Sequence, residues 1–187
     1  TCAYVCLQPN GEIKFDSVGR PAPGVEIKIA DNGEVLVKGP MLLKAYYQRP
    51  EATAESINDE GYFLTGDAGF LDEDGHLKII DRAKDVVKSG GEWISSVELE
   101  NHAMGCVGVR RAAVIAVPDA RWGEKPVAIV VLAEGAALTM PDLTEYCRVR
   151  LAGFKVPKEL IIRDSLPRNP SGKVLKRVLR TELETQP

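Results

Sequence analysis

The pattern of apolar residues changes near residue 82, and this change limits the chain to a fold built from two unlike parts. Before this point, alternating runs are separated by turn residues, as at 25–29 and 34–38, which flank Asn32-Gly33. This arrangement is typical of a β-hairpin. After this point, strand-like runs alternate with segments of helix length. We therefore predict an α+β fold, with a β-rich region at residues 1–82 and a compact α+β domain at residues 83–187.

Turn and capping signals place the individual elements. Pro50 followed by acidic residues predicts a short helix, because proline and negative charge both suit a first helical turn. Ser95 and Glu98 have the spacing of a capping box and predict a helix that runs to about residue 104. In the second part we also predict strands at 112–117, 126–132 and 159–163 and helices at 141–151 and 174–184.

Charge and cysteine usage exclude several classes of protein. The 24 basic and 27 acidic side chains are spread along the sequence, and the net charge of -3 gives no support to nucleic-acid binding. Cys2, Cys6, Cys106 and Cys147 lack C-x-x-C spacing, and scattered thiols suit a reducing cytoplasm. No stretch has the roughly 20 apolar residues of a membrane span. We expect a cytoplasmic protein without an integral membrane segment, and the start at Thr1 in place of Met indicates a fragment.

Several sequence motifs follow one another along the chain. They are Gly33–Pro40 (GEVLVKGP), Gly61–Asp67 (GYFLTGD), Gly75–Glu92 (GHLKIIDRAKDVVKSGGE) and Pro167–Lys173 (PRNPSGK). In this order they closely resemble the adenylate-forming superfamily of acyl-CoA synthetases, luciferases and peptide-synthetase adenylation domains. The run Ser89–Ser96 is most similar to medium- and long-chain fatty acyl-CoA synthetases. The resemblance implies that residues 1–82 end the large adenylation domain and that residues 83–187 form its mobile C-terminal lid.

Asp67 and Arg82 are the residues that the resemblance places beside the nucleotide. A carboxylate can accept hydrogen bonds from two adjacent ribose hydroxyls, and a guanidinium offers a fixed cationic fork to ribose or phosphate oxygens. Without the motif context, Asp67 would be interpreted as a turn aspartate. Arg82 would be interpreted as one half of a surface ion pair with Asp81 or Asp85.

Lys84 falls where the enzymes of this family bend between two domain orientations, so the resemblance makes it the hinge. Taken alone, it would be a solvated lysine. The following loop, which contains Lys88, Ser89, Gly90 and Gly91, is implied to contact coenzyme A, because in the family it enters the pantetheine tunnel. Glycines let a ligand approach the backbone closely, although an ordinary hairpin turn would explain them equally well.

Lys173 is the predicted catalytic residue. In the family, the matching lysine bridges the substrate carboxylate and the α-phosphate, and an ammonium on a loop suits that role as a compact point charge. A P-loop is excluded, because Gly172-Lys173 lacks the earlier glycine and is followed by Val174. The alternative is a surface lysine in a basic run with Lys176, Arg177 and Arg180.

Other expected parts of such an enzyme are not found in residues 1–187. The triphosphate loop, the acyl pocket and the glutamate associated with Mg²⁺ lie upstream in the family. His76 and His102 are far apart and have no metal-ligand partner at useful spacing, so we assign both to structure and predict no metal site.

The resemblance implies an AMP-forming acid–thiol ligase that joins a carboxylic acid, and most closely a fatty acid, to coenzyme A at the expense of ATP. Its cofactors would be ATP/AMP, coenzyme A and Mg²⁺, and its partner would be the missing N-terminal large domain. We expect this chain alone to be inactive. Two alternatives stay open: a non-catalytic nucleotide-binding or interaction module with the same fold, and an adenylation domain that serves a carrier protein.

Overall fold

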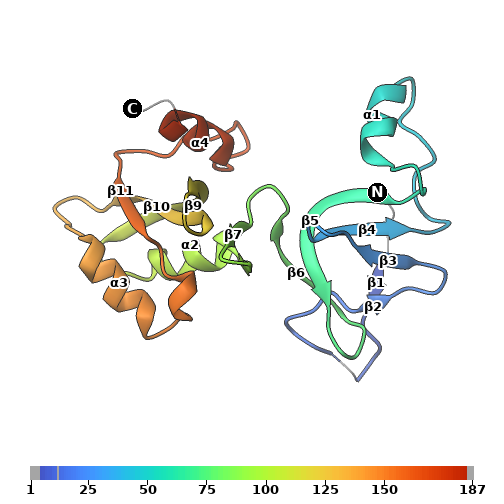
Figure 1. Ribbon diagram of the computed structural model, residues 1–187, viewed down its shortest axis with the longest axis horizontal. Helices are drawn as coiled ribbons and strands as arrows, with labels where there is room; N and C mark the ends of the chain where they lie inside the picture. Colours follow the sequence, from blue (N-terminus) through green and yellow to red (C-terminus); the bar gives the residue numbers. More distant parts are fainter. Residues whose placement is uncertain (1–4, 12, 185–187) are drawn as a thin grey trace. The chain divides into compact units, whose positions relative to one another are not determined.

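The computed structural model describes residues 5–11 and 13–184 (Figure 1). The chain divides into two compact units, Thr1–Lys84 and Asp85–Pro187. The first unit is mostly β-sheet, whereas the second combines a sheet with helices, so the predicted α+β class is confirmed. Within the two described ranges, the helices are too short or too polar to cross a membrane.

The first unit is built on an antiparallel sheet whose strands follow chain order: β3 (Glu26–Ile29), β4 (Glu34–Lys38), β5 (Phe63–Leu71) and β6 (Leu77–Arg82). Strands β3 and β4 form the hairpin predicted around Asn32-Gly33. A two-stranded sheet of β1 (Cys6–Leu7) and β2 (Arg20–Pro21) and the helix α1 (Pro50–Ser56) lie beside it. The alternate residues Val35 and Val37 pack with Leu77, so one face of the sheet carries the apolar cluster.

The second unit is a five-stranded sheet with helices on both faces. Its strands are β7 (Val87–Ser89), β8 (Glu92–Ile94), β9 (Val109–Asp119), β10 (Gly123–Leu132) and β11 (Glu159–Ile162). Strands β9 and β10 form a long antiparallel pair, and β11 adds to β10 in parallel. The helices are α2 (Ser96–Met104), α3 (Met140–Arg148) and α4 (Lys176–Glu184), with a short 3₁₀ turn at Gly153–Lys155.

Successive residues of β9 point into two separate apolar clusters. Val114 lies in the cluster that α2 and α3 cover, which contains Leu99 and Leu143. Ile115 lies in the opposite cluster, which contains Leu179 of α4. Figure 1 shows α4 on the other side of β9 and β10 from α2 and α3. The sheet of this unit is therefore buried on both faces, as expected for strands that are apolar throughout.

The predicted start of α2 at the Ser95 cap is confirmed, whereas the predicted end of α3 and the predicted start of α4 are wrong. Ser95 caps α2, since its hydroxyl accepts a hydrogen bond from the Glu98 N–H at 3.1 Å. The Glu98 carboxylate also lies 2.7 Å from the Lys155 ammonium. Helix α3 ends at Arg148 and not near 151. Helix α4 begins at Lys176 and not at 174, because Val174 forms an antiparallel β-bridge with Arg168.

Candidate functional site

Asp67 and Arg82 are brought together by the register of two paired strands. Asp67 lies in β5 directly opposite Arg82 in β6, and its Oδ1 is 3.3 Å from the Arg82 Nε. Both side chains are open to solvent, with 37% of the aspartate and 60% of the arginine exposed. Asp67 is therefore part of a strand and not of a turn. The Arg82 guanidinium pairs with Asp67. Of the two alternative partners, Asp85 pairs with Arg180, and Asp81 Oδ1 accepts the backbone N–H of Arg82 at 2.7 Å.

The backbone around Asp67 is held by a short hydrogen-bond network. The Thr65 hydroxyl donates to the Val35 carbonyl at 2.7 Å and accepts from the Asp67 N–H at 3.1 Å. The Gly66 N–H donates to Glu34 Oε1 at 2.9 Å. These bonds fix the two residues before Asp67 and its own N–H, so the backbone that carries the carboxylate is ordered before a ligand binds.

Lys84 lies in the turn between β6 and β7, as the last residue of the first compact unit, and it is exposed. The preceding residue is still anchored to the sheet, because the Ala83 N–H donates to the Gly66 carbonyl at 2.9 Å. The following residue, Asp85, is anchored in the second unit by Arg180, at 2.6 Å. Lys84 is thus the residue between two anchored positions.

Gly90 and Gly91 form the two-residue turn of the β7–β8 hairpin, and both have positive φ, +62° and +87°. This is the geometry of a type I′ turn, which glycine adopts without strain. Lys88 and Ser89 precede the turn in β7: the Lys88 ammonium lies 5.4 Å from the centroid of the Trp93 ring, and Ser89 is buried. The hairpin interpretation is therefore correct, and it leaves open what the turn contacts.

A cavity of about 190 Å³ adjoins this turn. It is lined by Ser89, Gly90, Glu92, Trp122, Phe154 and Lys158. The Gly90 N–H donates to the Trp122 carbonyl at 2.8 Å, and the Arg121 guanidinium stacks on the Trp122 ring at 4.5 Å. Sequence reasoning did not find Trp122 and Phe154, since single aromatic residues in separate loops carry no periodic signal. The cavity combines two aromatic side chains with one lysine and one glutamate, and its aromatic faces suit an apolar part of a ligand.

Lys173 is exposed on a loop that Asn169 organises. The Asn169 side-chain oxygen accepts hydrogen bonds from the Lys173 N–H at 2.8 Å and the Ser171 hydroxyl at 2.8 Å. The Asn169 N–H donates to the Lys173 carbonyl at 2.9 Å, and the Arg168 guanidinium donates to the Gly172 carbonyl. The backbone of Lys173 is therefore ordered. Among residues 5–11 and 13–184, its ammonium has no ion-pair partner.

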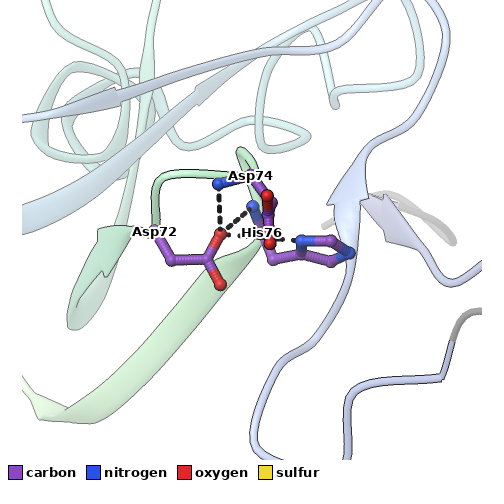
Figure 2. A group of neighbouring side chains, drawn as sticks. All are labelled: Asp72, Asp74 and His76. Atoms are coloured by element: carbon purple, nitrogen blue, oxygen red, sulfur yellow. Dashed lines mark hydrogen bonds and ion pairs between the residues drawn. The ribbon is translucent and has the colours of Figure 1, made fainter.

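Asp72, Asp74 and His76 cluster at the β5–β6 turn, with ligand atoms within 4.8 Å of one another (Figure 2). One Asp72 oxygen accepts the N–H groups of Asp74 and His76, at 3.1 and 2.9 Å, and lies 3.5 Å from the His76 Nδ1. The Lys14 ammonium lies 3.2 Å from Asp72 Oδ2 and 2.5 Å from Asp74 Oδ2. Because the carboxylates already have these donors, the cluster fits an ion pair and does not fit the open oxygen set that Mg²⁺ requires.

The ionisation of Asp72 reflects this setting. Hydrogen bonding from the His76 N–H, and then from the Lys14 ammonium, lowers the pKa of Asp72 to about 2. Lys14 likewise lowers the pKa of Asp74. His76 itself is buried, with 3% of its surface exposed, and neither ring nitrogen has a hydrogen-bond partner among the described residues. The cluster holds the 72–76 turn against the loop that carries Lys14.

Comparison with known proteins identifies the class to which this geometry belongs. Residues 98–173 match the AMP-binding enzyme C-terminal domain. The chain is 47% identical over 150 residues to the long-chain-fatty-acid–CoA ligase FadD13 of Mycobacterium tuberculosis, covering 80% of this chain and 29% of that protein. It is 43% identical over 177 residues to a feruloyl-CoA synthase of Amycolatopsis, covering 89% of this chain and 36% of the relative.

A solved structure shows the same fold. The ATP-bound structure of MatB from Rhodopseudomonas palustris superposes with a TM-score of 0.71 at 38% identity, covering 91% of this chain and 36% of that one. The chain therefore carries an AMP-binding enzyme C-terminal domain. It belongs to the adenylate-forming acyl-CoA ligase family. It spans about a third of the length of the relatives that it matches.

Proposed function

We propose that residues 1–187 are the C-terminal third of an AMP-forming acid–thiol ligase. In the first half-reaction, the carboxylate of the acid attacks the α-phosphorus of ATP, and pyrophosphate leaves. In the second, the thiol of coenzyme A attacks the acyl carbon, and AMP leaves. Residues 1–82 would end the large adenylation domain, and residues 83–187 would be the mobile lid. The family relationship and the three separate candidate sites support this proposal.

The paired Asp67 and Arg82 are the observation on which the proposal depends most. The register across β5 and β6 sets a carboxylate and a guanidinium 3.3 Å apart at an exposed position. A nucleoside offers adjacent ribose hydroxyls to the first and a phosphate or ribose oxygen to the second. A simple surface ion pair contributes little to stability, so stability alone is a weak reason for this arrangement.

Lys173 supplies the charge for the first half-reaction in this proposal. As the carboxylate attacks, negative charge builds up on the α-phosphate oxygens, and a positioned ammonium stabilises it more in the transition state than in the ground state. The ordered backbone of the 168–174 loop and the free reach of the ammonium support this role. Asn169 acts here as a positioning residue.

The second half-reaction would use the hairpin turn at Gly90-Gly91. The neighbouring cavity, which Trp122 and Phe154 help to line, supports the proposal that the thiol arm of coenzyme A binds beside this turn. A change of orientation at Lys84 would bring either the Lys173 loop or this turn into use. Lys88 and Ser89 would contribute contacts to coenzyme A.

The acid is proposed to be a fatty acid. The long-chain-fatty-acid–CoA ligase at 47% identity and the run Ser89–Ser96 support this choice. The feruloyl-CoA synthase, a relative named for an aromatic acid, is nearly as similar to this chain, at 43% identity. An aromatic acid is therefore the alternative substrate. A panel of fatty and aromatic acids tested with the full-length ligase would decide between them. We place the enzyme in the cytoplasm because Cys6, Cys106 and Cys147 are free thiols.

The experiment that tests the proposed function is pyrophosphate exchange in the full-length ligase with Lys173→Ala. We expect the exchange rate to fall at least about a hundredfold, in the range seen when one transition-state donor is removed. Thioester formation from a supplied acyl-adenylate should fall much less, because that step does not need the lysine at the α-phosphate.

The matched control for this experiment is Arg177→Ala. Arg177 is an exposed cation four positions along from Lys173, on the first turn of α4, and its loss tests for a general effect of charge. It should leave both half-reactions unchanged. Undiminished exchange with Lys173→Ala would remove the catalytic assignment and favour a non-catalytic nucleotide-binding module.

A further inference from the structure

Helix α4 contacts the body of the second unit through several side chains. Leu179 is fully buried in the apolar cluster beneath the helix. The Lys176 ammonium lies 2.7 Å from Glu100 Oε1 and 2.6 Å from the Ser96 hydroxyl, both on α2. Arg180, one turn further along, lies on the same face because residues four apart are neighbours on a helix. The helix that follows the Lys173 loop is therefore fixed at several points.

Arg180 connects this helix to the beginning of the unit. Its Nη2 donates to Asp85 Oδ1 at 2.6 Å, and the two side chains are only 21% and 13% exposed. Charge-assisted hydrogen bonds of this length are stronger than neutral ones, and partial burial limits screening by solvent. Val86 and Val87, which follow Asp85, are buried. The chain is thus held in the second unit from residue 85 onward.

On the other side of Lys84 the chain is held by a backbone hydrogen bond. The Ala83 N–H donates to the Gly66 carbonyl, next to Asp67, at 2.9 Å. A hinge is a short stretch that absorbs a large change of backbone dihedrals while its neighbours stay fixed. The Ala83 bond and the Asp85 ion pair together leave a single residue for that change.

We propose that Arg180 is a positioning residue. Its ion pair with Asp85 connects α4 to the residue that directly follows the hinge residue Lys84. Residue 85 and the Lys173 loop therefore move as one rigid body. The proposal rests on the proposed function for the role of Lys173. Loss of the ion pair would let the backbone turn at Asp85 as well as at Lys84. The orientation of the Lys173 loop would then vary, and fewer encounters would place its ammonium at the α-phosphate.

The test compares Asp85→Asn, Arg180→Gln and the double variant in the full-length ligase. The first readout is hydrogen exchange of the amides at 83–87 and in α4. We expect each single variant to speed exchange there about tenfold, which corresponds to about 1.4 kcal/mol. The double variant should be no worse than either single variant, because all three remove the same interaction.

The second readout, the kinetics of pyrophosphate exchange, separates a positioning role of Arg180 from a role in folding. In pyrophosphate exchange, the single variants should lower kcat about tenfold with little change in KM for ATP, since the Asp67 and Arg82 pair is intact. Arg180→Lys should restore part of the rate, because an ammonium can still reach the Asp85 carboxylate.

Arg163→Gln is the matched control. Arg163 is a similarly exposed arginine, at 24%, that pairs with Glu182 on the same helix but does not contact residue 85. It should leave kcat unchanged. If Arg163→Gln and Arg180→Gln lower kcat equally, the Arg180–Asp85 ion pair merely stabilises α4, and the proposal is wrong. The proposal is also wrong if the effects of Asp85→Asn and Arg180→Gln on hydrogen exchange add up in the double variant. Failure of the proposed function would instead be seen as unchanged activity in Lys173→Ala, while the hydrogen-exchange cycle still reports on the ion pair.

Discussion

The two units hold their proposed functional residues in different ways. In the first, Asp67 and Arg82 lie opposite each other on paired strands, so their separation is set by strand register. In the second, Gly90-Gly91 and Lys173 lie in short loops between ordered elements. A pair fixed by register is organised before a ligand binds. Loops on a rigid scaffold allow different groups to be used in successive steps.

The sheets that carry these residues are also packed differently in the two units. The sheet of the first unit has one apolar cluster, around Val35, Val37 and Leu77, and uses ion pairs to hold its loops. The sheet of the second unit is buried on both faces, and its loops project from that core. A loop can be positioned accurately only if the elements that carry it are fixed, which the two clusters and the α4 ion pairs achieve.

Replacing Asp67 with Asn gives the largest expected effect among the changes that address this comparison. The substitution keeps the shape of the side chain but removes the charge that we propose accepts hydrogen bonds from the ribose; a hydrogen bond with one charged partner is worth about 1.5–3 kcal/mol. We expect KM for ATP in pyrophosphate exchange to rise roughly ten- to a hundredfold by that estimate. The control is Asp59→Asn, an exposed aspartate elsewhere in the unit. If Asp67→Asn and Asp59→Asn change KM for ATP equally, the pairing of Asp67 with Arg82 across the two strands does not form a nucleotide site.

Substitutions in the β7–β8 turn give the next largest effect. Gly90→Ala and Gly91→Ala both force alanine to a positive φ, which costs roughly 1–2 kcal/mol. Only at Gly90 would the new Cβ press on a neighbour, the Trp122 ring, at 3.0 Å. We therefore expect both variants to slow thioester formation, Gly90→Ala more strongly, with pyrophosphate exchange unchanged. The two half-reactions are measured separately, with acyl-adenylate supplied for the second.

Two results would contradict this interpretation of the turn. If both glycine variants behave alike, contact with the Trp122 wall has no part in the thioester step. If both lower pyrophosphate exchange, the turn is needed for the fold of the unit and not for one half-reaction.

Much of the fold follows from local patterns, whereas the contacts of the site do not. The hairpin around Asn32-Gly33 and the helix capped by Ser95 were predictable because turn and cap signals lie within a few residues. The capping box in which Thr139 and Asp142 exchange hydrogen bonds was not predicted, although both residue types are suited to it. The start of α4 could not be read, because it depends on the bridge between Arg168 and Val174.

The site residues show the same division between local and distant information. Motifs single out Asp67, Arg82 and Lys173 one by one, but only strand register reveals that the first two form a pair. The contact of Trp122 with Gly90 joins distant parts of the sequence and carries no periodic signal. The Asp85 and Arg180 ion pair is hidden for the same reason, because many carboxylates in the sequence could have been the partner of this arginine.

Removing the ion pair between Lys14 and Asp72 in the first unit gives the smallest expected effect, a change in the pKa of Asp72. The pKa of Asp72 is lowered to about 2 from its ordinary 3.8, so its charge favours the folded state above pH 3.8, and this contribution is lost as the pH falls toward 2. Lys14→Met should raise the pKa of Asp72, but not to 3.8, because the His76 N–H still donates to the carboxylate. Carboxyl NMR titration of the chain measures this directly. An Asp72 pKa that does not change in Lys14→Met would mean that the turn is ordered by its own backbone, and that the ion pair to the loop adds nothing to it.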